Sequence, residues 1–158
     1  MAKYTEQARA GIKAFETHLT QVRKWHINVD YSKLSIDFGV TGEDLPMRVF
    51  IFANENTGML YCVYPFPGSI PENKRVEMAA VINQMNDFYG LGTVEFDISK
   101  GEILYRQTTC LVGLELTDRF CGVCISYALD LVDKYNDKFV MYAQGKINAE
   151  QLIALIKN

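Results

Sequence analysis

The sequence predicts an α+β fold in which helices cover an antiparallel sheet, with the element order α-ββββ-α-ββ-α-α. Near the N-terminus, apolar residues recur every three or four positions, which is the period of an amphipathic helix. Later segments alternate or run continuously apolar over strand lengths, and the last third returns to the helical period. Because short turns join consecutive strands, we expect antiparallel pairing, and the 158 residues are expected to form a single domain, 1–158.

The N-terminal half is predicted to contain one helix and four strands. Thr5 is the expected N-cap of the helix, whose apolar face collects Ala8, Ile12, Phe15, Leu19 and Val22. The strands are expected at 25–31, 34–40, 48–53 and 59–66. Because the third and fourth strands are almost continuously apolar, we expect both of their faces to be covered.

The middle of the chain is predicted to hold a proline-capped helix. The run Ser69-Ile70-Pro71-Glu72 matches a capping box with proline in the first turn, and Gly90 ends the helix after Tyr89. A second, weaker strip on this helix comprises Val76, Ala79, Ala80 and Asn83. This helix is either broadly buried in the core or uses the strip as the seam of a homodimer, and the strip is our predicted dimer interface.

The last part of the sequence is predicted to form a second hairpin and two helices. The hairpin strands are expected at 93–98 and 102–113. Thr117 is the expected N-cap of a long helix that ends at Gly145, and a short helix follows from Asn148.

Charge and hydropathy exclude several classes of protein. The net charge is −3 and the isoelectric point about 5.4, without the basic stripe that meets nucleic-acid phosphates. No apolar segment approaches the roughly 20 residues that span a bilayer, and the N-terminus lacks the apolar core of a signal peptide. We therefore expect a cytoplasmic protein with reduced cysteines that binds neither nucleic acid nor membrane.

The segment FCGVCI contains the only Cys-x-x-Cys pair, Cys121 and Cys124. Redox pairs of this kind lie at a helix N-terminus after an early strand, where the helix dipole lowers the thiol pKa. Here the pair follows the last predicted strand, and Cys124 shares an apolar stripe with Phe120 and Tyr127. We therefore expect two buried core thiols, and we predict no metal site, no cofactor and no catalytic residue.

The run MLYCVYPFPGSIP gathers several apolar residues within a short span, namely Leu60, Tyr61, Val63, Tyr64, Phe66 and Ile70. It is either a central strand that leads into a packed loop or the border of a surface that binds a partner. Our predicted partner-binding residues are Tyr61, Tyr64, Phe66 and Ile70, together with Ile12 and Phe15 of the first helix.

The architecture and the local sequence resemble the YbjN family, whose fold is like that of type III secretion chaperones. The resemblance covers roughly residues 25–142 and rests on RVFIFA, LYCVYPF, the segment from IPENKRVEM to TTCL, and LTDRFCGVCISYALDLVDKYNDKF. It implies a small, often dimeric, non-enzymatic domain described as a sensory-transduction regulator. It brings no active-site residues.

These observations together predict a non-enzymatic, chaperone-like or regulatory module that binds a partner protein through an apolar surface. The identity of the partner is not encoded in any motif. The alternatives are a thiol redox or small-ligand enzyme that uses Cys121 and Cys124, and a structural subunit of a larger complex. A low-pKa, rapidly alkylated Cys121 would favour the enzyme, and one stable stoichiometric partner would favour the subunit.

Overall fold

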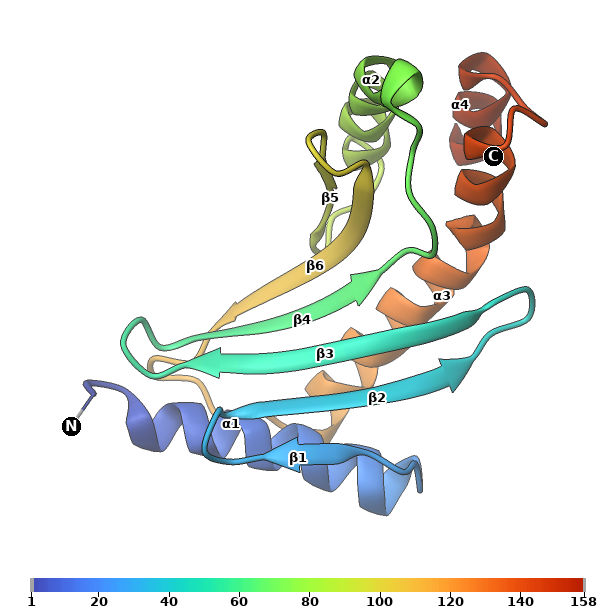
Figure 1. Cartoon of the computed structure of the whole chain (residues 1–158). Coiled ribbons are helices and arrows are strands. Elements are labelled where there is room, and N and C mark those ends of the chain that lie inside the picture. Colours follow the sequence, from blue (N-terminus) through green and yellow to red (C-terminus); the bar gives the residue numbers. More distant parts are fainter. Residues whose placement is uncertain (1, 158) are drawn as a thin grey trace.

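The computed structural model of the chain describes residues 2–157 and contains a six-stranded antiparallel sheet (Figure 1). The strands lie in the order β1-β2-β3-β4-β6-β5. In chain order the elements are α1 (Thr5–Thr17), β1 (Asn28–Asp30), β2 (Ser35–Thr41), β3 (Pro46–Asn54), β4 (Met59–Pro65), α2 (Arg75–Asn86), β5 (Thr93–Asp97), β6 (Glu102–Cys110), α3 (Asp118–Ala143) and α4 (Ala149–Lys157). The predicted α+β class and element order are therefore confirmed.

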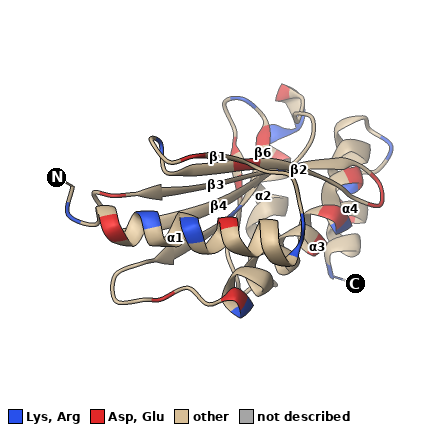
Figure 2. Cartoon of the chain, turned by 90° about the horizontal axis from the view of Figure 1, so that it is seen from below, with Lys and Arg blue, Asp and Glu red and all other residues tan. Residues whose placement is uncertain are grey.

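Alternating side chains give the sheet a covered face and an open face. In β3, Met47, Val49, Ile51 and Ala53 are buried beneath α1 and α3. The residues between them point to the opposite face, where Phe52 keeps 39% of its surface exposed. The expectation that both faces of β3 and β4 are covered is wrong, because α1 and α3 lie on the same side of the sheet (Figure 2).

The helix α3 covers much of the sheet and is the longest helix described, with 26 residues. The hydroxyl oxygen of Thr117 accepts a hydrogen bond from the N–H of Phe120 at 3.1 Å, which confirms the predicted N-cap. The apolar stripe of α3 faces the sheet and α4, and its buried members include Cys121, Cys124, Ile125, Ala128, Leu131, Val132, Tyr135 and Phe139.

A partly buried polar contact connects the turn after α1 to the start of α3. The helix α1 continues into a π-helical turn, His18–Val22, and the His18 side chain is buried. Its Nδ1 lies 2.7 Å from Oδ1 of Asp118, and the Nε–H of Arg23 donates to Nε2 at 3.3 Å. With Nε2 as an acceptor, the tautomer that fits both contacts carries its proton on Nδ1 and donates it to Asp118. Gly122 leaves room for the ring, because a Cβ there would lie 3.1 Å from Cε1 of His18.

Two of the predicted helix starts need correction. Thr5 is the first residue of α1 rather than its N-cap, and its hydroxyl donates to a carboxylate oxygen of Glu55 at 2.9 Å. The capping box at 69–72 does not form, and α2 begins only at Arg75 after a 3₁₀ turn. The reason is that the segment before α2 is tied to the sheet, where the N–H of Ile70 donates to the carbonyl of Gly101 at 2.8 Å.

The guanidinium of Arg75 reinforces this connection. It donates to the carbonyl of Ile70 at 3.1 Å and to three carbonyls of the turn between β5 and β6, those of Ile98, Ser99 and Lys100, at 3.3, 2.6 and 3.2 Å. A single side chain therefore joins the segment before α2 to the turn of the second hairpin.

Replacing Phe15 by Ala tests whether α1 belongs to the core. Phe15 is fully buried, so the substitution should lower the free energy of unfolding by about 3–5 kcal/mol. The matched control Lys13→Ala removes an exposed side chain and one exposed ion pair on the same helix, so it should cost no more than about 1 kcal/mol. Urea denaturation measures both, and equal losses in the two variants would contradict the packing of α1 described above.

Candidate functional site

Five of the six residues predicted to bind a partner are buried in the core. Ile12 and Phe15 pack under the sheet, and Tyr64 lies on the covered face of β4, with its ring centroid 5.9 Å from that of Tyr105. Phe66 and Ile70 are also buried. These side chains do not form an exposed surface, because they belong to the core between the sheet and its helices, as the alternative of a central strand leading into a packed loop has it for 59–71. Their role in binding stays a prediction.

The sixth residue, Tyr61, lies on the open face of the sheet. It is half-buried and stacks on Phe52 of β3, with a centroid distance of 5.0 Å. The guanidinium of Arg106 lies 6.0 Å from the Tyr61 ring centroid and pairs with a carboxylate oxygen of Glu95 at 2.7 Å. The open face therefore presents an aromatic pair beside an ion pair.

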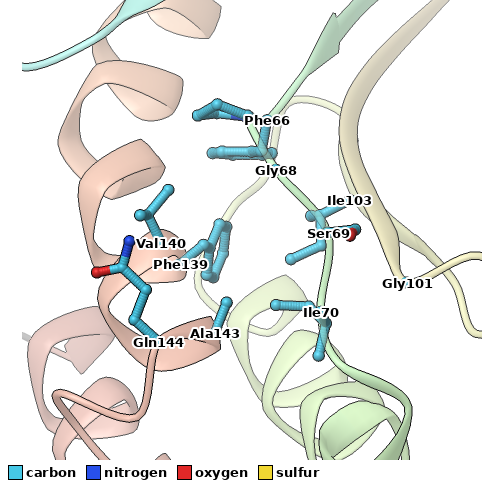
Figure 3. Close-up of a pocket in the computed structure, with 11 residues that line it drawn as sticks. Phe66, Gly68, Ser69, Ile70, Gly101, Ile103, Phe139, Val140, Ala143 and Gln144 are labelled. Atoms are coloured by element: carbon cyan, nitrogen blue, oxygen red, sulfur yellow. The ribbon is translucent and has the colours of Figure 1, made fainter.

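Phe66 and Ile70 come together at a small apolar cavity of about 180 Å³, which we call the Phe66 cavity. Figure 3 shows the segment that carries Phe66 and Ile70 on one side and Phe139, Val140 and Ala143 of α3 on the other. The rings of Phe66 and Phe139 meet edge to face at a centroid distance of 4.8 Å. Because an apolar cavity of roughly 150 Å³ can hold benzene, this one has room for a single apolar side chain.

A second candidate site lies where β6 extends beyond its neighbour β5. Pairing between the two strands runs from Glu102 to Arg106, with Thr93 opposite Arg106. Gly92 then turns the chain at a φ of +87°, and a Cβ there would lie 2.5 Å from the carbonyl oxygen of Arg106. Residues 107–110 therefore pair only with β4 and leave one strand edge free within the described structure.

The free hydrogen-bonding groups at this edge belong to Thr108 and Cys110. The N–H of Phe66 donates to the carbonyl of Ile103 at 2.9 Å, so Ile103 and every second residue after it direct their backbone groups to β4. Thr108 and Cys110 lie between these residues along the strand. Their backbone N–H and C=O groups therefore point away from β4. Among the described residues, none pairs with them.

A cavity of about 520 Å³ runs beside this edge, and we call it the β6 groove. Its lining includes Leu91, Gln107, Cys110, Leu114, Phe120 and Cys124. The groove therefore combines free backbone groups with apolar side chains, which are the two features that an added strand requires.

The predicted dimer strip lies on the outer face of α2. Val76 is 79% exposed, Ala80 and Asn83 are exposed, and Ala79 is half-buried. The opposite face of α2 carries Met78, Val81, Ile82 and Met85 into the core. The strip is thus accessible to a second molecule, and the dimer stays a prediction.

The Cys-x-x-Cys pair is buried in α3. Burial raises the pKa of the Cys121 thiol to about 12, with smaller contributions from Cys124 and Asp118. Burial also raises the pKa of Cys124. It raises the pKa of Cys62 well above the ordinary value of a thiol. All three thiols are therefore protonated near neutral pH, which is unfavourable for nucleophilic chemistry. Within residues 2–157, no group of three or more His, Cys, Asp or Glu side chains is arranged to hold a metal ion.

Among the described helices, none has the length and apolar character to cross a membrane.

The sequence comparison identifies one family. A model of the YbjN family, described as "Putative bacterial sensory transduction regulator", matches residues 19–141. No curated protein matches the chain in sequence at a significant level.

Solved structures share the fold at low sequence identity. A chain of the ExsC-ExsE complex aligns with a TM-score of 0.53 at 9% identity, over 87% of this chain and 96% of that one. A chain of the HopA1-SchA chaperone-effector complex gives 0.53 at 10% identity, over 80% and 96%. A chain from the structure of the Yersinia pestis type III secretion chaperone SycH with a fragment of YscM2 gives 0.50 at 12% identity, over 76% and 94%. The predicted type III secretion chaperone-like fold is therefore confirmed.

Thiol labelling tests the burial of the Cys-x-x-Cys pair. At about pH 7.5 an accessible thiolate attacks the disulfide of the reagent and displaces its other half as a thiolate, so only the exposed Cys110 of the folded protein should be modified within minutes. All four cysteines should react after denaturation, and Cys110→Ser should remove the fast reaction. A second thiol that reacts rapidly in the folded protein would revive the redox alternative.

Proposed function

Because the chain belongs to the YbjN family, and because its β6 edge is open, we propose that it is a non-enzymatic module that binds an extended segment of a partner protein. The observation that carries this proposal is the free edge at residues 107–110, which lies against the apolar β6 groove. Support also comes from the structurally similar chains, since each of the three belongs to a complex with another protein.

The mechanism is strand addition. A partner segment lies next to β6, in line with β5, and exchanges hydrogen bonds with the backbone of Thr108 and Cys110. Alternate side chains of the segment then point to opposite faces of the sheet. Those on the covered face bury apolar surface against Leu114 and Phe120. The backbone bonds supply affinity that is independent of sequence, and the side chains supply the selectivity.

A partner can gain further apolar contact at the Phe66 cavity, which has room for one side chain. This contact retains a role for Phe66 and Ile70, as walls of a cavity rather than as an exposed surface. The exposed strip of α2 is the surface through which we propose that two copies associate, since Val76 and Ala80 leave little bulk between two approaching helices.

Replacing Thr108 by Pro tests strand addition. The substitution removes the N–H that points to the free edge and leaves the bonds to β4 in place. Capture of partners from native lysate, quantified by mass spectrometry, should fall about tenfold, because the lost donor and the proline ring both block pairing. Thr108→Val keeps the N–H and should capture as the wild type does.

Thermal denaturation of both Thr108 variants establishes that they are folded before capture is compared. Equal recovery of the same partners by a folded Thr108→Pro variant would contradict strand addition at this edge. If the wild type recovers no protein besides itself, the binding function is wrong.

Replacing Ala80 by Glu tests the dimer. A carboxylate at the centre of a helix-to-helix seam is desolvated and faces its own copy, so the variant should be monomeric at concentrations where the wild type is dimeric. Light scattering after gel filtration measures the molar mass. Ala10→Glu makes the same change at an exposed position of α1 and should leave the mass unchanged. A monomeric wild type, or a dimeric Ala80→Glu, would contradict the α2 seam.

A further inference from the structure

The Phe66 cavity lies between two parts of the chain that are far apart in sequence. One wall consists of Phe66 and Ile70, from the segment between β4 and α2, together with Ile103 of β6 (Figure 3). The other wall is the C-terminal part of α3, which contributes Phe139 and Ala143. Four of these five side chains are buried and the fifth, that of Ala143, is half-buried, so the interior of the cavity is apolar.

The size and the lining of the cavity define the chemistry of a ligand. Its volume of about 180 Å³ exceeds the roughly 150 Å³ of an apolar cavity that holds benzene. Among the described residues that line it, none carries a charge, and the two with polar side chains, Ser69 and Gln144, are exposed at its mouth. A charged ligand would lose its hydration without gaining a partner, whereas an aromatic ring can pack against the rings of Phe66 and Phe139.

Residues 67–69 cross the mouth of the cavity with few attachments. The segment is held at its two ends, where the N–H groups of Phe66 and Ile70 donate to the carbonyls of Ile103 and Gly101 at 2.9 and 2.8 Å. Between these bonds the residue at position 67 is a proline without an N–H, and the next two residues donate no backbone hydrogen bond within the described structure. A small displacement of 67–69 therefore breaks no bond from these residues and gives a ligand a way in.

The cavity is separate from the β6 groove. Its contact with β6 is at Ile103, near the start of the strand, whereas the groove begins at Arg106 and continues to Cys110. Residues 103 and 108 are about 17 Å apart along a strand. Between them β5 occupies the side of β6 to which a partner segment would add. A segment paired with Thr108 meets β5 before it reaches the cavity, so we assign the cavity to a free small molecule.

We infer that the Phe66 cavity is a binding site for a small, uncharged, monocyclic aromatic molecule. The ring lies between α3 and the segment that precedes α2, where it contacts Phe66 and Phe139. The carbonyl of Ile70, on that segment, accepts a hydrogen bond at 3.1 Å from Arg75, the first residue of α2. A ligand that bridges the two walls therefore stabilises the start of α2 relative to α3. This site is additional to the proposed strand addition and does not depend on it.

Titration of the full-length chain with benzyl alcohol and with benzoate tests the inference. Two-dimensional NMR should show that benzyl alcohol shifts signals of the residues that line the cavity, with a dissociation constant of roughly 1 mM, as expected for the burial of one ring. Benzoate has the same ring but carries a charge. It should bind at least about tenfold more weakly, because the apolar walls desolvate its carboxylate.

Replacing Ala143 by Leu fills the cavity and should weaken the binding of benzyl alcohol at least about tenfold. Ala10→Leu makes the same change at an exposed position of α1 and should bind as the wild type does. Thr108→Pro should also bind as the wild type, since the cavity does not use the free end of β6. If Ala143→Leu does not fold, as judged by thermal denaturation, Ala143→Met fills the cavity with a more flexible side chain.

The outcomes separate this inference from the proposed function. Benzyl alcohol that shifts no signal well above the expected dissociation constant, or only signals of residues outside the cavity, would overturn the site. Undiminished binding to a folded variant of Ala143 would do the same. Benzoate that binds as tightly as benzyl alcohol would overturn the uncharged class of ligand. None of these results changes strand addition, which the capture of partners by the Thr108 variants decides.

Discussion

The fold depends on covering one face of the sheet. Six strands present an apolar face that α1 and α3 bury, and the aromatic residues of both layers fill the space between them. Burial of this surface is the dominant favourable term in folding, so it determines which side chains remain for other purposes. The surfaces that stay uncovered include the open face of the sheet, the outer strip of α2 and the end of β6 beyond β5.

Two polar side chains next to this core differ in how far their hydrogen-bonding groups are satisfied. Arg75 donates to four backbone carbonyls and so fastens the segment before α2 to the second hairpin. Gln107 uses its NH₂ group within the protein and keeps its oxygen unpaired. Buried polar groups are usually satisfied, so Gln107 is an exception. The first arrangement joins two segments of the chain, and the second leaves an acceptor without a partner among the described residues.

Periodicity predicted the elements well, but it did not predict which apolar side chains stay exposed. Helical and strand periods follow from which side chains must be buried, so the order of elements and the cap at Thr117 could be read from the sequence. An apolar residue such as Phe15 or Tyr64 has the same pattern whether it faces a helix of its own chain or a partner. The free edge at residues 107–110 left one signal, since the expected strand at 102–113 is much longer than its partner at 93–98. The start of β5 depends on the turn at Gly92, which strand periodicity does not predict.

The brevity of the free edge also matters for solubility. An exposed strand edge is a template on which identical chains can pair without limit, as in the growth of fibrils. Along β6, β5 occupies one side as far as Arg106 and the strand ends at Cys110, so four residues of β6, Gln107 to Cys110, have no neighbouring strand on that side in the described structure. Four residues of free edge have room for a short segment. They provide too few backbone hydrogen bonds for the sheet of another molecule to continue this one. The staggered end of β5 thereby limits how much of β6 another sheet could pair with.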